Sequence, residues 1–523
     1  MTGGTARNSV VLAGWTLVSR ATGLLRVVVI GAVFGPTWFA NCFQAANTVP
    51  GLVFSLVAGP VLAMVVVPGL VGALSDGGPA RAREVLGRVT GWVVAVSAAI
   101  SALLVVAAPV LAWTLTRGIP DPGERSLGWW VSMLLVVLVA PQIPLNCVAY
   151  LGLSAQRARD RFALSAAAPA VENVILIGAV LLAGWRYGTG MEIDRVPLGM
   201  LLVLGVGSTV GVGLHAALQL FGAARVGLLA RPSARWRRDP DALAVTRRLS
   251  GAVGVATLPS VALYALLAIA ASVPGGVFVV QMSTSVLFAL SYLSARAVSM
   301  ASLPRLSEAA HRRDMGMFGA MWRQALAYAL TAGLPPLVML AILAGPTATV
   351  LANGRLEHSA LVGPLAACLA VVAAAQLVTG LSDLGNQALY ARLEDRVPRT
   401  ASRVTLAVTL LLGAAALLVP PGAARLVWLV AAILVGELVA GAMVLTRIRR
   451  ITRPERFVDG HALRATLLAA AAMAPVGAAT WWLQETYGHG NRLGILAVLL
   501  GGGALAVGVY GLVLRRAWGP RRA

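Results

Sequence analysis

Two arginines lie inside the first long apolar segment of the chain, residues 10–34, and they are its clearest candidates for binding chemistry. At a rise of about 1.5 Å per residue, Arg20 lies ~16 Å along a helix from Ser9, near the middle of a hydrocarbon layer roughly 30 Å thick. A guanidinium at that depth costs roughly 2.5–3.5 kcal/mol, so it normally faces a water-filled cavity or a counter-charge. Arg20 and Arg26 therefore predict a polar cavity that offers cations to an anion. Snorkelling to the interface is the alternative for Arg26.

The composition places these arginines in a membrane protein. Of 523 residues, 58% are hydrophobic and 12% are charged, and many apolar runs reach the roughly 20 residues that cross a bilayer. The sequence therefore predicts an all-α polytopic membrane protein with about fourteen spanning segments. They are residues 10–34, 38–67, 89–115, 127–153, 162–184, 197–222, 250–271, 276–302, 324–345, 360–389, 401–420, 424–446, 464–484 and 493–514.

The residue types that enzymes use most are scattered along the chain. Cys42, Cys147 and Cys368 are isolated in apolar runs, and they predict neither a disulfide framework nor a metal site. No His, Asp and Glu residues cluster with metal-ligand spacing, and no glycine-rich loop is placed to hold a phosphate. The longest loop, residues 223–249, leaves no room for an aqueous domain. We expect no enzymatic activity, no cofactor and no metal.

The distribution of arginine predicts the topology. All 42 basic residues are arginines, and 32 of them lie at the termini and in the alternate loops that fall on the same side as the termini. The opposite loops carry seven. Because the arginine-rich side is normally cytoplasmic, both termini are expected in the cytoplasm. The net charge of +22 then indicates topology and contact with anionic bilayer lipids, and not nucleic-acid binding.

Two pairs of landmarks indicate an internal repeat. Residues 67–70 (VPGL) and 303–306 (LPRL) are 236 positions apart, and so are residues 153–156 (LSAQ) and 389–392 (LYAR). An even number of segments separates the copies, which predicts parallel six-helix repeats with a cavity between them. We expect an N-terminal lobe at 1–222, a cytoplasmic inter-lobe loop at 223–249, a C-terminal lobe at 250–446 and a C-terminal helix pair at 464–514.

Further short motifs stand in order along the first twelve segments. They are residues 18–26 (VSRATGLLR) with 33–35 (VFG), 141–142 (PQ), 161–162 (RF) with 168–169 (AP) and Asn173, 303–307 (LPRLS), and 389–392 (LYAR) with 395–396 (DR) and Pro398. In these motifs and their spacing the chain resembles the MurJ/MviN flippases of lipid-linked peptidoglycan precursors. That family belongs to the multidrug/oligosaccharidyl-lipid/polysaccharide exporter superfamily.

The resemblance implies a function and a site. It implies that the protein flips lipid II, the undecaprenyl-pyrophosphate-linked peptidoglycan precursor, from the cytoplasmic to the outer leaflet of the bacterial plasma membrane by alternating access. It also implies that Arg20 and Arg26 are cavity-facing cations, whose planar donors suit a pyrophosphate. The implied partners are this anionic lipid-linked substrate, bilayer lipids, a coupling cation or the membrane potential, and cell-wall synthesis enzymes. A related exporter of drugs or of another polyprenyl-linked glycan is the alternative.

The chain also departs from the family pattern. Asn41 stands where the family usually has an acidic residue, and Ser285 stands at a usual arginine of the eighth segment. Residues 50–55 (PGLVFS) lack the arginines that the family has there. The cavity is therefore less cationic than the family predicts. Either Asn41 and Gln44 assist Arg20 and Arg26 in binding the substrate, or the cargo differs.

Polar residues of the later segments form a second group of candidates. Asp383 and Asn386 are three residues apart on one predicted helix face, where they could bind a coupling cation, pair with an arginine of the opposite lobe, or hydrogen-bond between helices. Glu172 and Glu437 are single carboxylates in apolar segments, predicted to be protonated, paired or part of a proton relay. His215 is expected to pack between helices, and Arg296 to snorkel to the interface.

Overall fold

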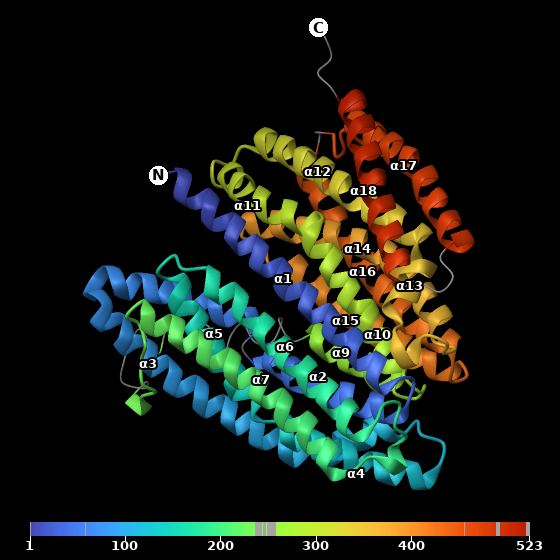
Figure 1. Ribbon diagram of the computed structural model, residues 1–523. Helices are drawn as coiled ribbons and strands as arrows, with labels where there is room; N and C mark the ends of the chain where they lie inside the picture. The colour runs from blue at the N-terminus through green and yellow to red at the C-terminus, as the bar shows by residue number, and fades with distance from the viewer. Residues whose placement is uncertain are drawn as a thin grey trace. The chain divides into compact units, whose positions relative to one another are not determined.

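Helices form every regular element of the described residues. The computed structural model describes residues 2–57, 59–235, 243, 247, 258–453, 456–487 and 492–518, and no strand occurs in these ranges (Figure 1). Twelve helices of the described residues are long and apolar enough to cross a membrane. The predicted class, an all-helical polytopic membrane protein, is therefore confirmed.

The predicted number of fourteen spanning segments remains a prediction. The second predicted segment, residues 38–67, is divided between α2 (Trp38–Val57) and the start of α3 (Gly59–Thr116), and α2 is not among the twelve long apolar helices. Of the seventh, residues 250–271, the described part is α9 (Leu258–Ala270), which at 13 residues is shorter than a bilayer requires.

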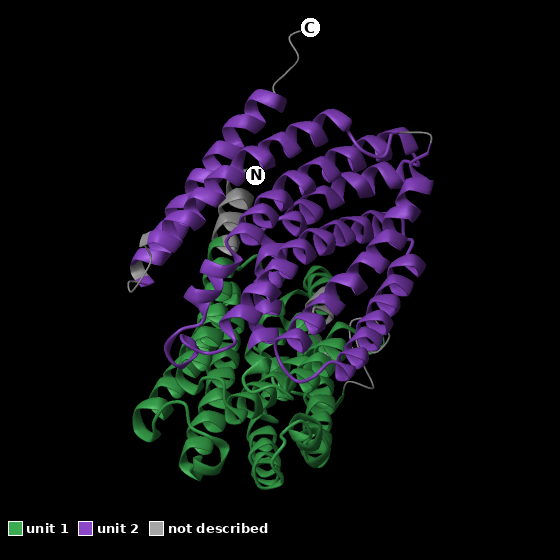
Figure 2. Cartoon of the chain, turned by 90° about the vertical axis from the view of Figure 1, so that its right-hand side faces the viewer, with its two compact units in different colours: residues 1–278 green, residues 279–523 purple. Residues whose placement is uncertain are grey.

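The chain divides into two compact units, residues 1–278 and 279–523 (Figure 2). Besides α2, α3 and α9, the first unit contains α1 (Thr2–Phe34), α4 (Pro122–Val139), α5 (Gln142–Arg157), α6 (Ala163–Tyr187), the 3-10 turn η1 (Ile193–Arg195) and α7 (Leu198–Arg225). The division falls later than the predicted lobe boundary at 223–249, because α9 packs on α2 and α3. Most of residues 236–257 lie outside the described residues.

Backbone breaks in the first unit follow from local sequence. α3 bends at Gly78, whose φ of 67° is readily adopted by glycine. The α4–α5 junction falls at Ala140 and Pro141, where proline has no N–H to continue the helix. Asp121 caps α4 by accepting a hydrogen bond from the backbone N–H of Glu124 at 2.8 Å.

The second unit begins within α10 (Gly276–Leu293) and ends with α18. It also contains α11 (Ala295–His311), α12 (Met315–Ile342), α13 (Ala344–Leu351), η3 (Gly354–Leu356), α14 (Val362–Ala391), α15 (Arg396–Ala415), η4 (Ala416–Leu418), α16 (Ala423–Ile451), α17 (Gly460–Tyr487) and α18 (Arg492–Trp518). The last two helices pack on each other and on α12, where the Tyr510 hydroxyl donates to the carbonyl of Thr331 at 2.8 Å.

The order of the helices is similar in the two units, which supports the internal repeat. α11 begins 236 positions after α3, and α12 begins 236 positions after Pro79, the residue that follows the bend in α3. In the first unit α5 and α6 both pack on α7, and in the second α14 and α15 both pack on α16. Asp160 after α5 and Leu393 after α14 both have positive φ. The repeated segments thus fold with the same local turns.

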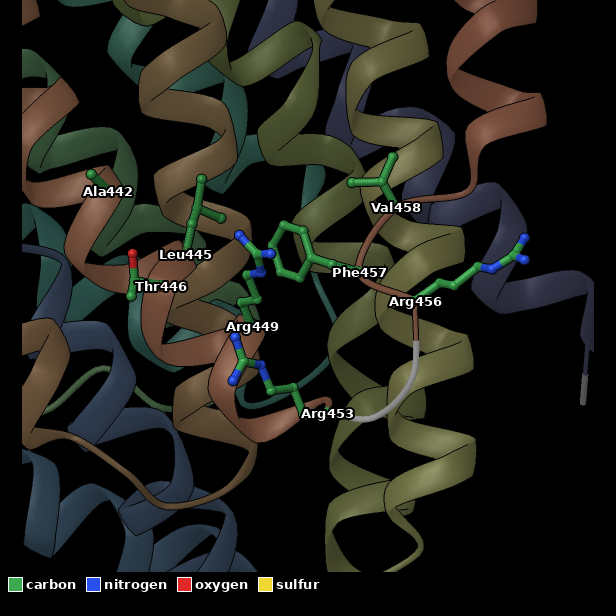
Figure 3. A pocket seen from close by; sticks show the side chains of 8 residues that line it. All are labelled: Ala442, Leu445, Thr446, Arg449, Arg453, Arg456, Phe457 and Val458. Atoms are coloured by element: carbon green, nitrogen blue, oxygen red, sulfur yellow. The ribbon is translucent and has the colours of Figure 1, made fainter.

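The junction between α16 and α17 is strongly basic. α16 carries Arg449 and Arg450 in its last turn, and Arg453 follows directly after its end. Residues 456–459 then lead into α17, and the side chains of Arg449, Arg453 and Phe457 line a cavity there (Figure 3).

Candidate functional site

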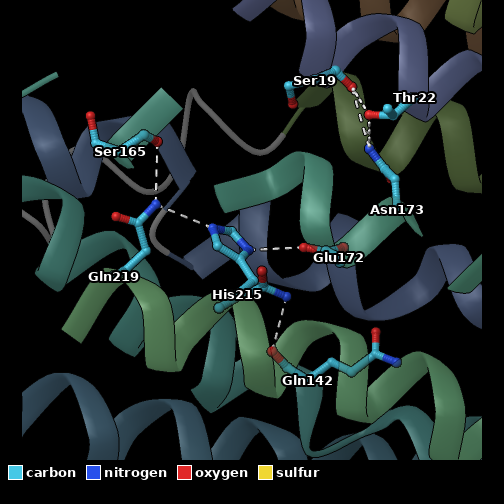
Figure 4. A network of polar contacts seen from close by, with 9 residues as sticks. Ser19, Thr22, Gln142, Ser165, Glu172, Asn173, His215 and Gln219 are labelled. Carbon is cyan, nitrogen blue, oxygen red and sulfur yellow. Dashed lines mark hydrogen bonds and ion pairs between the residues drawn. The ribbon is translucent and has the colours of Figure 1, made fainter. Parts of the chain in front are cut away.

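Helix α1 is fixed to α6 beside the first predicted cation. The Asn173 amide on α6 donates to the carbonyl of Ser19 at 3.3 Å and to the hydroxyl of Thr22 at 3.2 Å (Figure 4). The Thr22 hydroxyl in turn lies 3.0 Å from the carbonyl oxygens of Val18 and Ser19. These contacts hold the turn of α1 from which Arg20 projects.

The two cations of α1 occupy different environments in the first unit. The Arg20 side chain is exposed on the unit's surface, whereas Arg26 is half-buried. The carboxylate of Glu172 on α6 lies close enough to Arg26 to attract it electrostatically. Glu172 is thus a partial counter-charge for Arg26, and its effect is smaller than that of burial. Arg20 is the cation more accessible to a ligand.

A chain of polar side chains that begins at Glu172 joins α6, α7 and α5. Nδ1 of His215, on α7, lies 2.9 Å from Oε2 of Glu172 (Figure 4). The Gln219 amide nitrogen lies 3.4 Å from Nε2 of His215 and 3.2 Å from the carbonyl of Ser165, to which it donates. The Gln219 amide oxygen accepts a hydrogen bond from Gln156 at 2.7 Å.

This chain of hydrogen bonds assigns the proton of His215. The oxygen of Gln219 is engaged by Gln156, so its NH2 group faces Nε2 of His215 and donates to it. Nε2 is then an acceptor, and the ring hydrogen lies on Nδ1, which donates to Glu172. Glu172 therefore accepts the ring N–H of His215, which fixes the orientation of its carboxylate.

The polar residues of α2 divide into a satisfied and an unsatisfied group. Asn41 is buried, its NH2 group donates to the carbonyls of Val273 at 2.7 Å and Ala271 at 3.3 Å, and its oxygen accepts from the N–H of Val277 at 3.1 Å. It therefore closes the turn between α9 and α10. Gln44 is equally buried, yet neither of its amide atoms has a hydrogen-bond partner among the described residues. Gln44 is accordingly better placed than Asn41 to accept a ligand or a water.

The predicted ion-coupling residues lie on α14 and α16, two helices of the second unit that pack on each other. The guanidinium of Arg296 lies 3.5 Å from the Asp383 carboxylate and 4.5 Å from the centre of the Tyr292 ring. Glu437 on α16 is close enough to Asp383 for the two carboxylates to repel each other. The amide oxygen of Asn386 is buried, and no described residue donates a hydrogen bond to it.

The structure gives Asp383 a partner within its own unit, the guanidinium of Arg296. Arg296 is 41% exposed but is held by a carboxylate and an aromatic face, so it does more than snorkel. Arg296 and Asp383 are 87 positions apart in the sequence, so sequence patterns did not predict this pair. Among the described residues, no group of three or more His, Cys, Asp and Glu side chains is arranged to hold a metal ion.

A family model described as "Lipid II flippase MurJ" matches residues 30–500 of the chain. The chain belongs to the MurJ family. It is similar to the "Probable lipid II flippase MurJ" of Synechocystis sp., with 26% identity over 216 residues, which are 41% of this chain and 39% of that protein. The protein of the same description from Vibrio cholerae is 24% identical over 247 residues, 46% of this chain and 44% of that protein. The aligned stretch thus spans less than half of these curated relatives.

Solved structures show that the MurJ-like fold extends over nearly the whole chain. "Lipid II flippase MurJ, inward closed conformation" superposes with a TM-score of 0.73 at 15% identity, over 97% of this chain and 99% of that chain. An inward-facing multidrug resistance MATE family transporter of the MOP superfamily superposes with a TM-score of 0.59 at 13% identity, over 84% of this chain and 96% of that chain. At these identities the likeness concerns the fold alone.

Proposed function

We propose that the protein flips lipid II from the cytoplasmic to the outer leaflet of the plasma membrane for cell-wall synthesis. The match of the MurJ family model to residues 30–500 carries this proposal. A pyrophosphate-linked sugar headgroup cannot cross hydrocarbon unaided, so its carrier must offer a wet path and cations that replace water around the phosphates. Arg20 on α1 is an exposed guanidinium of the kind required.

The substrate site that we propose contains Arg20, Arg26, Asn41 and Gln44. Arg20 binds the pyrophosphate directly through its planar donors. Arg26 adds positive charge that Glu172 partly neutralises. Gln44 offers an amide that no described residue hydrogen-bonds. Asn41 holds the turn between α9 and α10 through its hydrogen bonds to Val273 and Val277.

Transport by alternating access requires a driving force. We propose that Asp383, Asn386 and Glu437 couple transport of the substrate to movement of a cation. The carboxylates of Asp383 and Glu437 and the amide oxygen of Asn386 are oxygen donors of the kind that hard cations prefer. Membrane potential is the alternative driving force. Cell-wall synthesis enzymes are the protein partners that this activity predicts, and no catalytic step is assigned to the chain itself.

A related exporter is the second candidate function, favoured by the MATE-type neighbours in fold and by the missing cavity charges at Asn41 and Ser285. Depletion of the protein in cells separates the two candidates. Accumulation of lipid II on the cytoplasmic leaflet is expected from the flippase. Unchanged lipid II together with accumulation of another polyprenyl-linked glycan, or with lost drug efflux, would favour the exporter.

A further inference from the structure

A basic cavity of about 640 Å³ lies at the junction between α16 and α17 of the second unit. It is lined by the basic and polar residues Arg449, Arg453, Arg456 and Thr446 and by the apolar residues Ala442, Leu445, Phe457 and Val458. Figure 3 shows the guanidinium of Arg449 beside the Phe457 ring, with Arg453 below it and Arg456 pointing away from both. Cationic and apolar side chains are thus both present on α16 and on the segment that leads into α17.

Glu394 and Asp459, two carboxylates of the described residues, are engaged with other groups. Arg447, on the same helix, binds Glu394 through two contacts of 2.6 and 3.0 Å. Asp459 caps α17 by accepting from the backbone N–H of His461 at 2.9 Å and of Ala462 at 3.3 Å. Among the described residues, no carboxylate forms an ion pair with Arg449, Arg453 or Arg456. The cavity therefore carries a positive charge that the described part of the chain does not neutralise.

The geometry of the cavity is fixed by packing, and it does not depend on a ligand. The Phe457 ring lies 5.5 Å from the ring of buried Trp322 on α12. Arg323 of the same helix donates to the carbonyl of Arg456 at 3.1 Å. Arg449 lies in the last turn of α16, Arg453 lies two residues beyond its end, and both line the cavity with like charge. Because the cavity holds them near each other, an anion between them is favoured.

The position of the cavity at the end of α16 and its mixture of cationic and apolar side chains indicate the kind of ligand. α16 is one of the long apolar helices, and its end lies at the level of lipid headgroups when the helix crosses a bilayer. We propose that this cavity binds the phosphate of an anionic phospholipid. Arg449 and Arg453 bind the phosphodiester, and Leu445, Phe457 and Val458 contact the glycerol and the first acyl carbons. A soluble phosphate shares the charge of this ligand and lacks its apolar part.

Native mass spectrometry of the detergent-purified, full-length protein tests the proposal with phosphatidylglycerol, zwitterionic phosphatidylcholine and inorganic phosphate as probes. The variants are Arg449→Gln, the double variant Arg449→Gln/Arg453→Gln, and Arg450→Gln. Arg450 is an exposed arginine of the same helix end that does not line the cavity, so it is the matched control for loss of one charge.

We expect phosphatidylglycerol affinity to fall several-fold in Arg449→Gln and at least about tenfold in the double variant, since charge-assisted hydrogen bonds are lost. Arg450→Gln and all phosphatidylcholine binding should be unchanged. Equal losses in Arg449→Gln and Arg450→Gln would overturn the site, because the charge of the helix end alone would then explain binding. Inorganic phosphate binding as tightly as phosphatidylglycerol, with the same dependence on Arg449, would overturn the lipid as the ligand. Melting temperatures of all variants report whether folding is retained.

Discussion

Glu172 on α6 and His215 on α7 lie with 2.9 Å between Oε2 and Nδ1, and the Glu172 carboxylate also attracts the guanidinium of Arg26. The carboxylate therefore has two neighbours that stabilise its charge, one an imidazole N–H and the other a guanidinium. His215 is fixed in turn by Gln219, so the orientation of the carboxylate depends on residues of three helices. We interpret this arrangement as the support that holds Arg26 inside an apolar unit.

Replacing Glu172 should destabilise the first unit and impair transport together. Glu172→Gln removes the counter-charge of Arg26 and the acceptor of the His215 N–H, and the expected loss of stability is about 1–3 kcal/mol. The melting temperature of the purified protein measures it. In the Glu172→Gln background, His215→Gln should lower the melting temperature less than it does in the wild-type protein, because the two residues share one interaction. Additive losses would show that the two side chains act independently.

Asn41 gives a prediction that separates a structural from a substrate-binding role. Asn41→Asp removes both donors to the carbonyls of Val273 and Ala271, so the melting temperature should fall by an amount equivalent to about 1–3 kcal/mol. Asn41→Ala should behave similarly. A variant with unchanged melting temperature and lost lipid II transport would instead assign Asn41 to direct contact with the substrate.

The carboxylate of Asp383 should be required for coupling, beyond its pairing with Arg296. Asp383→Asn should reduce transport and abolish its dependence on the coupling cation, because an amide keeps the shape but not the charge. The matched control is Asp395→Asn, which breaks an exposed pair with Arg399. If Asp383 only neutralises Arg296, the double variant Asp383→Asn/Arg296→Gln should recover full transport. That recovery would exclude a cation site.

The arginine distribution predicts which loops face the cytoplasm. Single cysteines at Ser75 and Arg450, both exposed, should resist an impermeant thiol reagent in intact cells. Cysteines at Asp194 and His358, also exposed, should react. The background lacks Cys42, Cys147 and Cys368, which are buried in the native protein. Labelling of Ser75→Cys from outside would contradict cytoplasmic termini and the predicted order of segments.

Sequence patterns predicted the helical class, which the structure confirms, because it depends on the composition of continuous apolar runs. The repeated lobes and the binding role of Arg20 and Arg26 remain predictions. Sequence patterns did not predict which polar groups meet. Glu172 and His215 are 43 residues apart, and their helices are apolar around most of their circumference, so hydrophobic periodicity does not set how each helix is rotated. Gln44 and Asn41 looked equivalent in sequence. Only packing against α9 and α10 distinguishes the satisfied amide from the unsatisfied one.

The central claim is that Arg20 anchors a pyrophosphate during transport of lipid II. Its most direct test is translocation of lipid II in vesicles that contain the purified protein, with accessibility of the headgroup on the opposite leaflet as the readout. We expect transport by the wild-type protein, a loss of roughly 10- to 100-fold in Arg20→Ala, and partial recovery in Arg20→Lys, which keeps the charge without the bidentate donors. Membrane insertion should be normal in both variants, because removing a charge from an apolar helix relieves an insertion cost. Wild-type rates in Arg20→Ala, or no lipid II movement by the intact protein, would contradict the account.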